Sequence, residues 1–345
     1  MGTSSLEGAA DTRVPVTLLT GFLGSGKTTL LNHLLDAPEA GRVAVVVNEA
    51  GEVALDGRLI IGTTEEIVEL REGCVCCTVR GDLAVAVGRL LDRRRRWFRP
   101  LRFDRIIVEC SGLASPGPVV QTFLLDPRLA AETRMDGVIA LASAADLHRQ
   151  LGEHAEASEQ LAYADRVVLN HVDRAADVDA AAALVRTINP GAPIDRVERG
   201  AAPARELLDL RGAEPGRWRF GSDSVPVIGA VAHHAGGAGT TTHVVLRASR
   251  PLDLDQLKLF LMFVAARRTW TLMRLKGIFH VSGLSRGVVA HGVYQWLELG
   301  PGPMEPPGES QLLLIGRDLD REELTRGWEV VTGRPSPGPS TSRAT

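Results

Sequence analysis

The chain has 345 residues, four cysteines and a formal net charge of -3 at pH 7. This length is sufficient for a full-sized hydrophobic core and for two domains. Since 39 Lys and Arg are balanced by 42 Asp and Glu, the composition offers no broad basic surface for nucleic acid or an anionic membrane. We therefore expect small anions and other proteins as partners.

The first residues do not resemble a secretory signal. Residues 1–13 are small and polar, without the basic and then apolar profile of a secretory signal, and we expect a disordered tail there. No apolar run reaches the ~18 residues that a membrane-spanning helix needs. These features predict a cytoplasmic protein without a membrane partner.

The first chemical motif is a glycine-rich loop between a predicted strand and a predicted helix. Residues 14–20 (VPVTLLT) form a β-branched apolar run typical of a buried strand, and residues 28–35 (TTLLNHLL) are helix-like. Between them, residues 21–28 (GFLGSGKT) fit the phosphate-binding pattern GxxxxGK[ST] at every fixed position. The order of strand, loop and helix is the one that a P-loop requires.

The physical chemistry of this loop assigns a role to each residue. Backbone N–H groups of a glycine-rich loop can surround an anion, and the following helix adds the positive end of its dipole. Lys27 is expected to reach the β- and γ-phosphates, and the Thr28 hydroxyl to ligate Mg²⁺. The residues expected around the phosphates are Gly21, Gly24, Ser25, Gly26, Lys27, Thr28 and Thr29. The loop does not distinguish ATP from GTP.

Three of the four cysteines are clustered in the sequence Gly73-Cys74-Val75-Cys76-Cys77. This is too few and too clustered for a disulfide framework, and it indicates metal or redox chemistry instead. Three thiolates can bind one soft ion such as Zn²⁺, Co²⁺ or Cu⁺. Without a fourth ligand nearby, the pattern favours an open, exchangeable metal site, and vicinal-thiol redox chemistry is the alternative. Cys110, by contrast, is expected to be a small buried residue.

A second chemical motif is expected at the end of another strand, in residues 105–112 (RIIVECSG). In P-loop NTPases an acidic residue at the tip of a neighbouring strand holds Mg²⁺ opposite the P-loop hydroxyl, and Glu109 fits this role. Gly112 is expected to lie near the γ-phosphate, where its amide can detect whether that phosphate is present. The alternative for Glu109 is an ordinary surface residue at a strand end.

The sequence at residues 166–173 (RVVLNHVD) suggests how the base is read. GTPases bind guanine through NKxD, in which the Asp accepts hydrogen bonds from the base N1–H and N2–H₂. Asn170 and Asp173 have this spacing, whereas His171 replaces the Lys that usually covers the base. Because an imidazole can also stack on a purine, the pattern favours GTP.

The remaining pattern predicts an α/β domain followed by a smaller one. Continuous apolar strands that alternate with helices indicate a mostly parallel sheet covered on both faces, which we assign to a P-loop domain at 14–211. We expect a linker at 212–242, a small α+β domain at 243–332 and a disordered tail at 333–345. The predicted strands are 14–20, 43–48, 105–109, 137–142, 166–170, 243–248, 272–281 and 287–299, and the helices are 28–35, 81–94, 119–125, 155–164, 176–188, 252–266 and 319–328.

Taken together, these motifs resemble the CobW family of GTPase metallochaperones, which are relatives of the UreG and HypB nickel-delivery GTPases, over nearly the whole chain. The resemblance rests on TLLTGFLGSGKTTLLNHLL, VVVNEAGEVALDG, REGCVCCTVRGDL, FDRIIVECSGLASPGPVVQTF and ADRVVLNHVD, with weaker C-terminal matches in LMRLKGIFHVSG and IGRDLDREEL. It implies a P-loop GTPase domain followed by a small α+β domain. It also implies slow GTP hydrolysis coupled to the transfer of a transition metal to a client protein.

The resemblance further assigns the metal ligands. It makes Cys74, Cys76 and Cys77 ligands for the cargo, with Zn²⁺ expected and Co²⁺ or Fe²⁺ as alternatives. The loop that contains Asn48, Glu49 and Glu52 would be a switch between nucleotide and metal. Since Val47 stands where some members carry a metal-binding Glu, Glu52 is the expected carboxylate ligand. The family is also compatible with a homodimer.

The chain departs from the family pattern at Ala50, where many members have Phe, at Val47 and at His171. It also lacks the long His-rich insertion of several zinc-handling members. Two other functions are compatible with parts of the sequence. One is an ATP-dependent kinase of a small molecule, and the other is a non-enzymatic adaptor in which the cysteine motif is a structural zinc knuckle.

Overall fold

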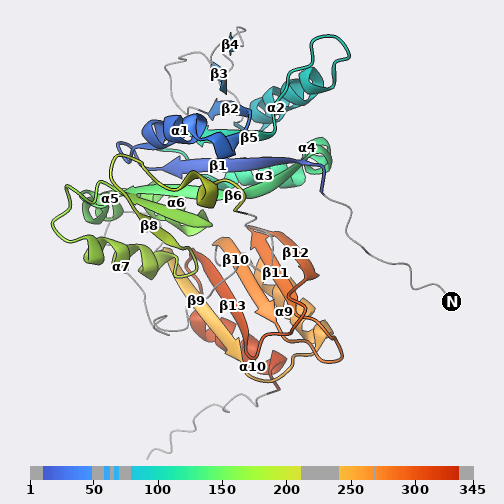
Figure 1. The fold of residues 1–345 in the computed structure, drawn as a ribbon. Helices are drawn as coiled ribbons and strands as arrows, with labels where there is room; N and C mark the ends of the chain where they lie inside the picture. Colours follow the sequence, from blue (N-terminus) through green and yellow to red (C-terminus); the bar gives the residue numbers. More distant parts are fainter. Residues whose placement is uncertain are drawn as a thin grey trace, which may run out of the picture.

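Two β-sheets organise the chain in the computed structural model (Figure 1). The structure describes residues 11–48, 58–62, 66–69, 79–210, 241–267, 269 and 271–333. The predicted linker, apart from its last two residues, lies outside these ranges, as do most of both expected tails. The fold class is confirmed: a largely parallel α/β sheet is followed by a smaller antiparallel sheet with helices.

The first sheet has eight strands in the order β4-β3-β2-β5-β1-β6-β7-β8. The six neighbouring strands β2, β5, β1, β6, β7 and β8 are parallel. Strands β3 and β4 add an antiparallel hairpin next to β2, at one edge of the sheet. Their bounds are β1 Val14–Gly21, β2 Val43–Asn48, β3 Arg58–Gly62, β4 Glu66–Glu69, β5 Arg105–Cys110, β6 Thr133–Ser143, β7 Arg166–Asn170 and β8 Ile194–Arg196.

Both faces of the central strands of this sheet are buried, which explains their uninterrupted apolar sequences. Neighbouring residues of one strand belong to different cores: Leu18 packs with α2, α3, α6 and α7 on one face, and Leu19 with α1 and α8 on the other. Such two-sided burial is typical of parallel sheets. The helices and the short 3-10 helix are α1 Lys27–Asp36, η1 Pro38–Ala40, α2 Val79–Arg95, α3 Gly117–Leu125, α4 Pro127–Glu132, α5 Leu147–Glu153, α6 Ala155–Tyr163, α7 Val178–Ile188 and α8 Ala204–Leu207.

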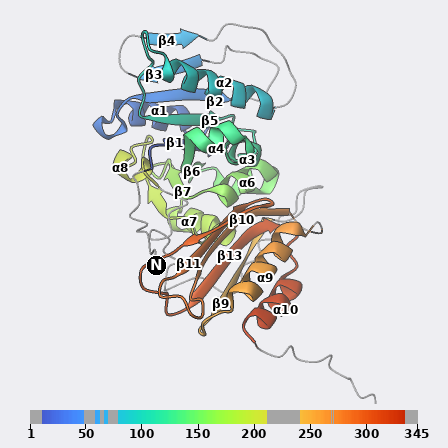
Figure 2. The same ribbon diagram turned by 90° about the vertical axis from the view of Figure 1, so that its right-hand side faces the viewer.

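The second sheet is antiparallel, with the order β12-β11-β10-β13-β9. Two helices cover one of its faces, as Figure 2 shows, and Phe260 and Trp328 pack between them at a ring distance of 5.5 Å. Met273 and Ile315 on the opposite face join the core of the first domain. The elements are β9 Thr241–Ala248, α9 Leu254–Ala266, β10 Thr271–Phe279, β11 Val288–Val293, β12 Trp296–Pro301, β13 Ser310–Arg317 and α10 Arg321–Val331.

Three features of the second domain differ from the sequence prediction. The single strand expected at 287–299 is a hairpin, because Tyr294 adopts a φ of 53° and turns the chain between β11 and β12. Strand β13 was not predicted. Strand β9 begins at Thr241, inside the expected linker, where Thr241 pairs with Arg317 in the ladder.

The amino-terminal boundary also differs. Residues 11–13 were expected to belong to a disordered tail, but Arg13 donates a hydrogen bond from Nη1 to the carbonyl of Ala130 at 3.3 Å. A terminal segment becomes ordered when its side chains find partners on the folded domain. Arg13 is therefore held against α4.

Candidate nucleotide site

The glycine-rich loop at 21–26 connects β1 to α1 and contains backbone angles that only glycine adopts easily. Gly26 has a φ of 100°, and a Cβ atom there would lie 2.5 Å from Nδ2 of Asn170. Gly21 has a φ of 143°, and its Cβ would lie 2.4 Å from the carbonyl oxygen of Leu141. Both positions therefore exclude larger residues, through conformation and through contact. Gly24 is the third loop glycine with a positive φ, of 74°.

The start of α1 has the properties of an anion site. The helix begins at Lys27, and its N-cap residue Gly26 provides no side-chain acceptor for the first N–H groups. Thr28 and Thr29 lie in this first turn. The Ser25 hydroxyl is buried and has no hydrogen-bond partner among the described residues. Uncapped N–H groups and a buried unpaired hydroxyl beside them fit a bound phosphate.

The Lys27 ammonium group lies over the same loop. Its Nζ donates hydrogen bonds to the carbonyl oxygens of Gly21 at 2.7 Å and Phe22 at 3.2 Å. Burial lowers the Lys27 pKa, while the Glu109 carboxylate acts in the opposite direction. A partly desolvated cation that donates to carbonyl oxygens of the loop is well suited to exchange them for phosphate oxygens.

Thr28 and Glu109, the two predicted Mg²⁺ residues, are brought together by the fold. The register of β1 and β5 pairs Leu19 with Glu109, so this carboxylate lies at the carboxyl edge of the sheet. Oγ1 of Thr28 donates to Oε1 of Glu109 at 3.4 Å, and Glu109 is only 9% exposed. The hydroxyl and carboxylate oxygens are ligands that Mg²⁺ prefers. The donor set therefore fits this ion.

The neighbouring Cys110 is buried, as expected from the sequence. Burial raises the pKa of its thiol to about 12. A thiol with such a pKa stays protonated, whereas a metal ligand must be a thiolate. Cys110 is therefore a packing residue of β5.

Gly112, predicted near the γ-phosphate, lies against the glycine-rich loop. A Cβ atom at Gly112 would lie 2.9 Å from the backbone nitrogen of Leu23. Its carbonyl accepts a hydrogen bond of 3.0 Å from Nε2 of Gln160, which also donates to the carbonyl of Ala114 at 3.2 Å. Gln160 was not predicted from the sequence, because a glutamine within an amphipathic helix carries no local signal for such a role.

The base-recognition residues lie at the end of β7. Nδ2 of Asn170 donates to the carbonyl of Ser25 at 2.9 Å, and its Oδ1 accepts from the backbone N–H of Gly200 at 3.0 Å. Asn170 therefore connects the glycine-rich loop to residues 198–201, a turn that the sequence did not identify. The sequence signal for this turn is Gly200, and in the structure both Arg199 and Gly200 have positive φ.

Two residues that follow this strand, His171 and Asp173, differ in their contacts. His171 has a φ of 59°, and its Nδ1 lies 3.1 Å from Oγ of Ser143. The Asp173 side chain is 35% exposed and lies 3.8 Å from Nε of Arg174. Its carboxylate thus has capacity for further hydrogen bonds. Asp173 and the glycine-rich loop follow parallel strands of the same sheet, so they lie at the same edge.

The predicted metal ligands Cys74, Cys76, Cys77 and Glu52 lie outside the described residues, as does Glu49 of the expected switch loop. In the ranges that the structure does describe, no group of three or more His, Cys, Asp or Glu residues could hold a metal ion. Within the same ranges, no helix is both long and apolar enough to span a bilayer.

Comparison with known proteins places both halves of the chain in one family. Residues 15–196 match the CobW/HypB/UreG nucleotide-binding domain, and residues 241–332 match the cobalamin synthesis protein CobW C-terminal domain. The zinc chaperone YjiA of Escherichia coli is 31% identical over 314 residues, covering 90% of this chain and 96% of the relative. The zinc chaperone CobW of Pseudomonas aeruginosa is 35% identical over 359 residues, covering 90% of each.

A solved structure supports the same relationship. The crystal structure of Zn(II)-bound YjiA GTPase from E. coli superimposes with a TM-score of 0.70 at 27% sequence identity. The similarity covers 92% of this chain and 99% of that chain. Both the glycine-rich domain and the antiparallel sheet thus have counterparts in one protein.

Proposed function

We propose that this chain, which belongs to the CobW/HypB/UreG family, is a GTPase that binds zinc and delivers it to a client protein. The observation that carries the GTPase assignment is the convergence of the glycine-rich loop, Asn170 and Asp173 at one edge of the sheet. The zinc assignment rests on the relatives named zinc chaperones and on the cysteine motif.

Each described residue of the site has a role in GTP binding. The loop N–H groups and Lys27 bind the phosphates, and Asp173 accepts hydrogen bonds from the guanine N1–H and N2–H₂. Thr28 and Glu109 would hold Mg²⁺, which supplies neutralisation of the phosphate charge when bound. Hydrolysis then depends on positioning a water molecule and on charge stabilisation, without a covalent intermediate.

The register of β2 suggests how nucleotide and metal are coupled. Val47 and Asn48 at the end of β2 pair with Glu109 and Cys110 of β5. The chain that continues from β2 toward Glu52 and the cysteine motif therefore starts beside the proposed Mg²⁺ residue. We propose that GTP orders this segment around Cys74, Cys76 and Cys77, and that loss of the γ-phosphate releases the metal. Co²⁺ and Fe²⁺ remain alternative cargoes.

A metal competition experiment tests this coupling. Zinc affinity is measured against a chromogenic chelator with the protein in GTP·Mg²⁺, in GDP·Mg²⁺ and without nucleotide. We expect GTP to raise zinc affinity by about tenfold or more, which is the usual scale of allosteric coupling. Cys76→Ser should remove the high-affinity site, whereas Cys110→Ser should keep it. Equal zinc affinity in the GTP and GDP states would exclude coupled delivery.

The two other functions make different predictions. A small-molecule kinase would bind ATP as well as GTP, whereas the guanine contacts proposed for Asp173 disfavour ATP. An adaptor with a structural zinc knuckle would unfold when zinc is removed. We expect the metal-free protein to stay folded, because the described residues alone form three hydrophobic cores.

A further inference from the structure

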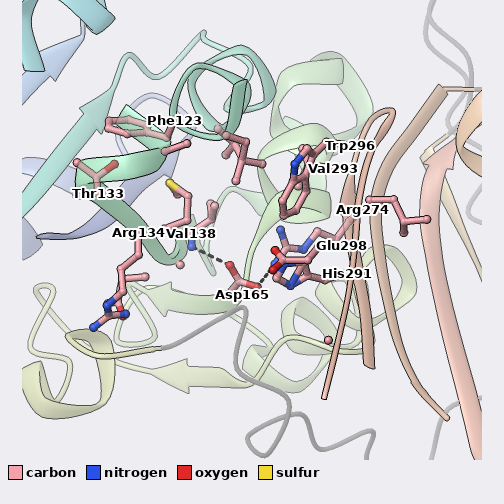
Figure 3. A pocket seen from close by; sticks show the side chains of 18 of the residues that line it. Phe123, Thr133, Arg134, Val138, Asp165, Arg274, His291, Val293, Trp296 and Glu298 are labelled. Carbon is pink, nitrogen blue, oxygen red and sulfur yellow. Dashed lines mark hydrogen bonds and ion pairs between the residues drawn. The ribbon is translucent and has the colours of Figure 1, made fainter. Parts of the chain in front are cut away.

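A cavity of about 600 Å³ lies between the two domains, far along the sheet from the nucleotide site (Figure 3). Its walls include α3 and the first half of β6 from the α/β domain, and β11 and β12 from the antiparallel sheet. The start of β6 is the amino edge of the parallel sheet, whereas the nucleotide residues lie at the carboxyl edge. The cavity is therefore a separate site, within the size range of small-molecule pockets.

One wall of the cavity is apolar and aromatic. Phe123 from α3 and Val293 from β11 line it, together with Trp296 at the start of β12. The Trp296 ring packs beside the ring of His291, with centroids 5.2 Å apart and an interplanar angle of 32°. Figure 3 shows Phe123, Val293 and Trp296 above the Asp165 carboxylate and His291 beside it. Such a wall suits a flat apolar group.

The other end of the cavity is charged. Asp165 is buried directly before β7, and one of its oxygens accepts from the backbone N–H of Val138 at 2.9 Å. The other oxygen faces Nη2 of Arg274 and Nζ of Lys276, the latter at 2.7 Å. Two cations, Arg274 and Lys276, thus share one oxygen of this carboxylate.

Arg274 retains hydrogen-bonding capacity at this end. Its side chain is only 9% exposed, and its Nε has no hydrogen-bond partner among the described residues. Nε is enclosed by protein atoms, so a ligand can meet this guanidinium only through the part of Arg274 that lines the cavity. An acidic group there would make a charge-assisted contact with Arg274.

His291 adds a neutral polar surface and no positive charge. Burial, followed by the charge of Arg274, lowers the His291 pKa to about 3. Nε2 of this neutral ring lies 3.2 Å from Oε2 of Glu298, which also lines the cavity. His291 therefore supports a flat ligand through its face and carries no charge of its own.

We propose that this interdomain cavity binds a small organic anion, with its planar apolar part against Trp296 and His291 and its acidic group toward Arg274. The ligand would contact both domains at once. Phe123 lies on α3, and this helix begins five residues after Gly112 in the sequence, so occupancy is placed to influence the nucleotide loops. The binding site itself does not depend on the identity of the metal or the client.

The aromatic sulfonate 8-anilinonaphthalene-1-sulfonate is a suitable probe, because it combines a flat apolar body with one negative charge. Full-length protein is titrated with this probe, and the bound fraction is measured by equilibrium dialysis. Energy transfer from tryptophan to the bound probe reports its location. We expect one saturable site with transfer from Trp296.

Gly300→Leu is the most specific variant, because it fills the cavity. A Cβ atom at Gly300 has room, because its nearest neighbour would be Cγ2 of Val289 at 3.9 Å. Residues 296 and 300 lie on the same face of β12, so a leucine at position 300 would extend into the cavity on the side of Trp296. We expect it to weaken probe binding by about tenfold or more, since displaced contacts cannot be recovered elsewhere. Arg274→Gln should weaken the sulfonate in the same way, if circular dichroism shows a native fold.

Trp97→Ala is the matched control, because Trp97 is fully exposed. It removes one tryptophan but should leave both probe affinity and the energy transfer from Trp296 intact. Nucleotide binding by Gly300→Leu should equal that of the wild type, which separates this proposal from the GTPase assignment. Unchanged probe affinity in a folded Gly300→Leu protein would overturn the proposal, as would several equivalent weak sites.

Discussion

The Asn170 side chain donates a hydrogen bond of 2.9 Å to the Ser25 carbonyl of the glycine-rich loop. The same amide accepts from Gly200, so one buried residue connects the proposed phosphate site with the turn at 198–201. Hydrogen bonds of a buried amide are costly to leave unmade. The base end and the phosphate end of the site are therefore held in register by this chain's own residues.

The first prediction concerns Gly26 and Gly24, which both have positive φ but differ in their surroundings. A Cβ at Gly24 would meet nothing within 4 Å, so Gly24→Ala should cost only about 1 kcal/mol of backbone strain. Gly26→Ala also places a Cβ 2.5 Å from the Asn170 amide and should cost at least about 3 kcal/mol. Urea unfolding of the nucleotide-free proteins measures both values.

A double-mutant cycle identifies the cause of this difference. In an Asn170→Ala background the contact with the amide is absent, so the cost of Gly26→Ala should fall toward that of Gly24→Ala. If the cost of Gly26→Ala is the same in both backgrounds, the contact with Asn170 does not explain the requirement for glycine.

The second prediction separates the role of Lys27 in binding from its effect on stability. Because burial lowers the Lys27 pKa, its charged form is disfavoured in the folded protein without nucleotide. Lys27→Met keeps the stem and removes the charge, so the Tm without nucleotide should rise by about 1–3 °C. The stabilisation by GTP·Mg²⁺ should be lost, since the phosphate contact is removed. Thermal scans with and without nucleotide check both results; a lower Tm without nucleotide would contradict the first.

The third prediction concerns Gln160, which supports the loop after β5. Its Nε2 donates to two carbonyls, of Gly112 and Ala114, and Gln160→Leu leaves both without this donor. We expect a loss of about 2 kcal/mol in stability. The affinity for a non-hydrolysable GTP analogue should fall more than that for GDP, because Gly112 is proposed to lie near the γ-phosphate.

The control for Gln160 lies on the same helix. The Ser158 hydroxyl contacts the carbonyl of Ala155 and the Thr241 hydroxyl, both away from the Gly112 loop. Ser158→Ala should therefore change stability without changing the ratio of GTP-analogue to GDP affinity. Equal losses of the two affinities in Gln160→Leu would assign Gln160 a purely structural role.

The parts of the fold that sequence predicted are those with local signals. The apolar run containing Leu18 and Leu19 predicted a strand buried on both faces, and the glycines, Lys27 and Asn170 have fixed spacings that carry chemical meaning. The hairpin at Tyr294 was missed because a positive φ at tyrosine is rare and neither Gly nor Pro marks the turn. Gln160 and the Asp165 cluster were missed because their partners lie far away in the sequence.

The last prediction uses Asp165 to test how strongly the two domains are coupled. Burial alone would raise the Asp165 pKa, but the charges of Arg274 and Lys276 outweigh it and lower this pKa to about 2. A carboxyl group whose folded pKa is lowered stabilises the fold above its unfolded pKa of 3.8, and this stabilisation disappears as pH falls toward 2. The contribution of this carboxylate to the free energy of unfolding at neutral pH is about 2 kcal/mol.

Asp165→Asn should destabilise the protein at pH 7 by about 3–5 kcal/mol, because it leaves two buried cations without their carboxylate. Urea unfolding from pH 6 to pH 3 should show the gap between wild type and Asp165→Asn narrowing with falling pH, since only the wild type loses the carboxylate charge. Combining Asp165→Asn with Lys276→Met should restore part of the stability at pH 7, because one of the two buried cations is then removed. A pH-independent gap, with no recovery in the double variant, would mean that Asp165 acts through its hydrogen bond to Val138 rather than through the cations of the second domain.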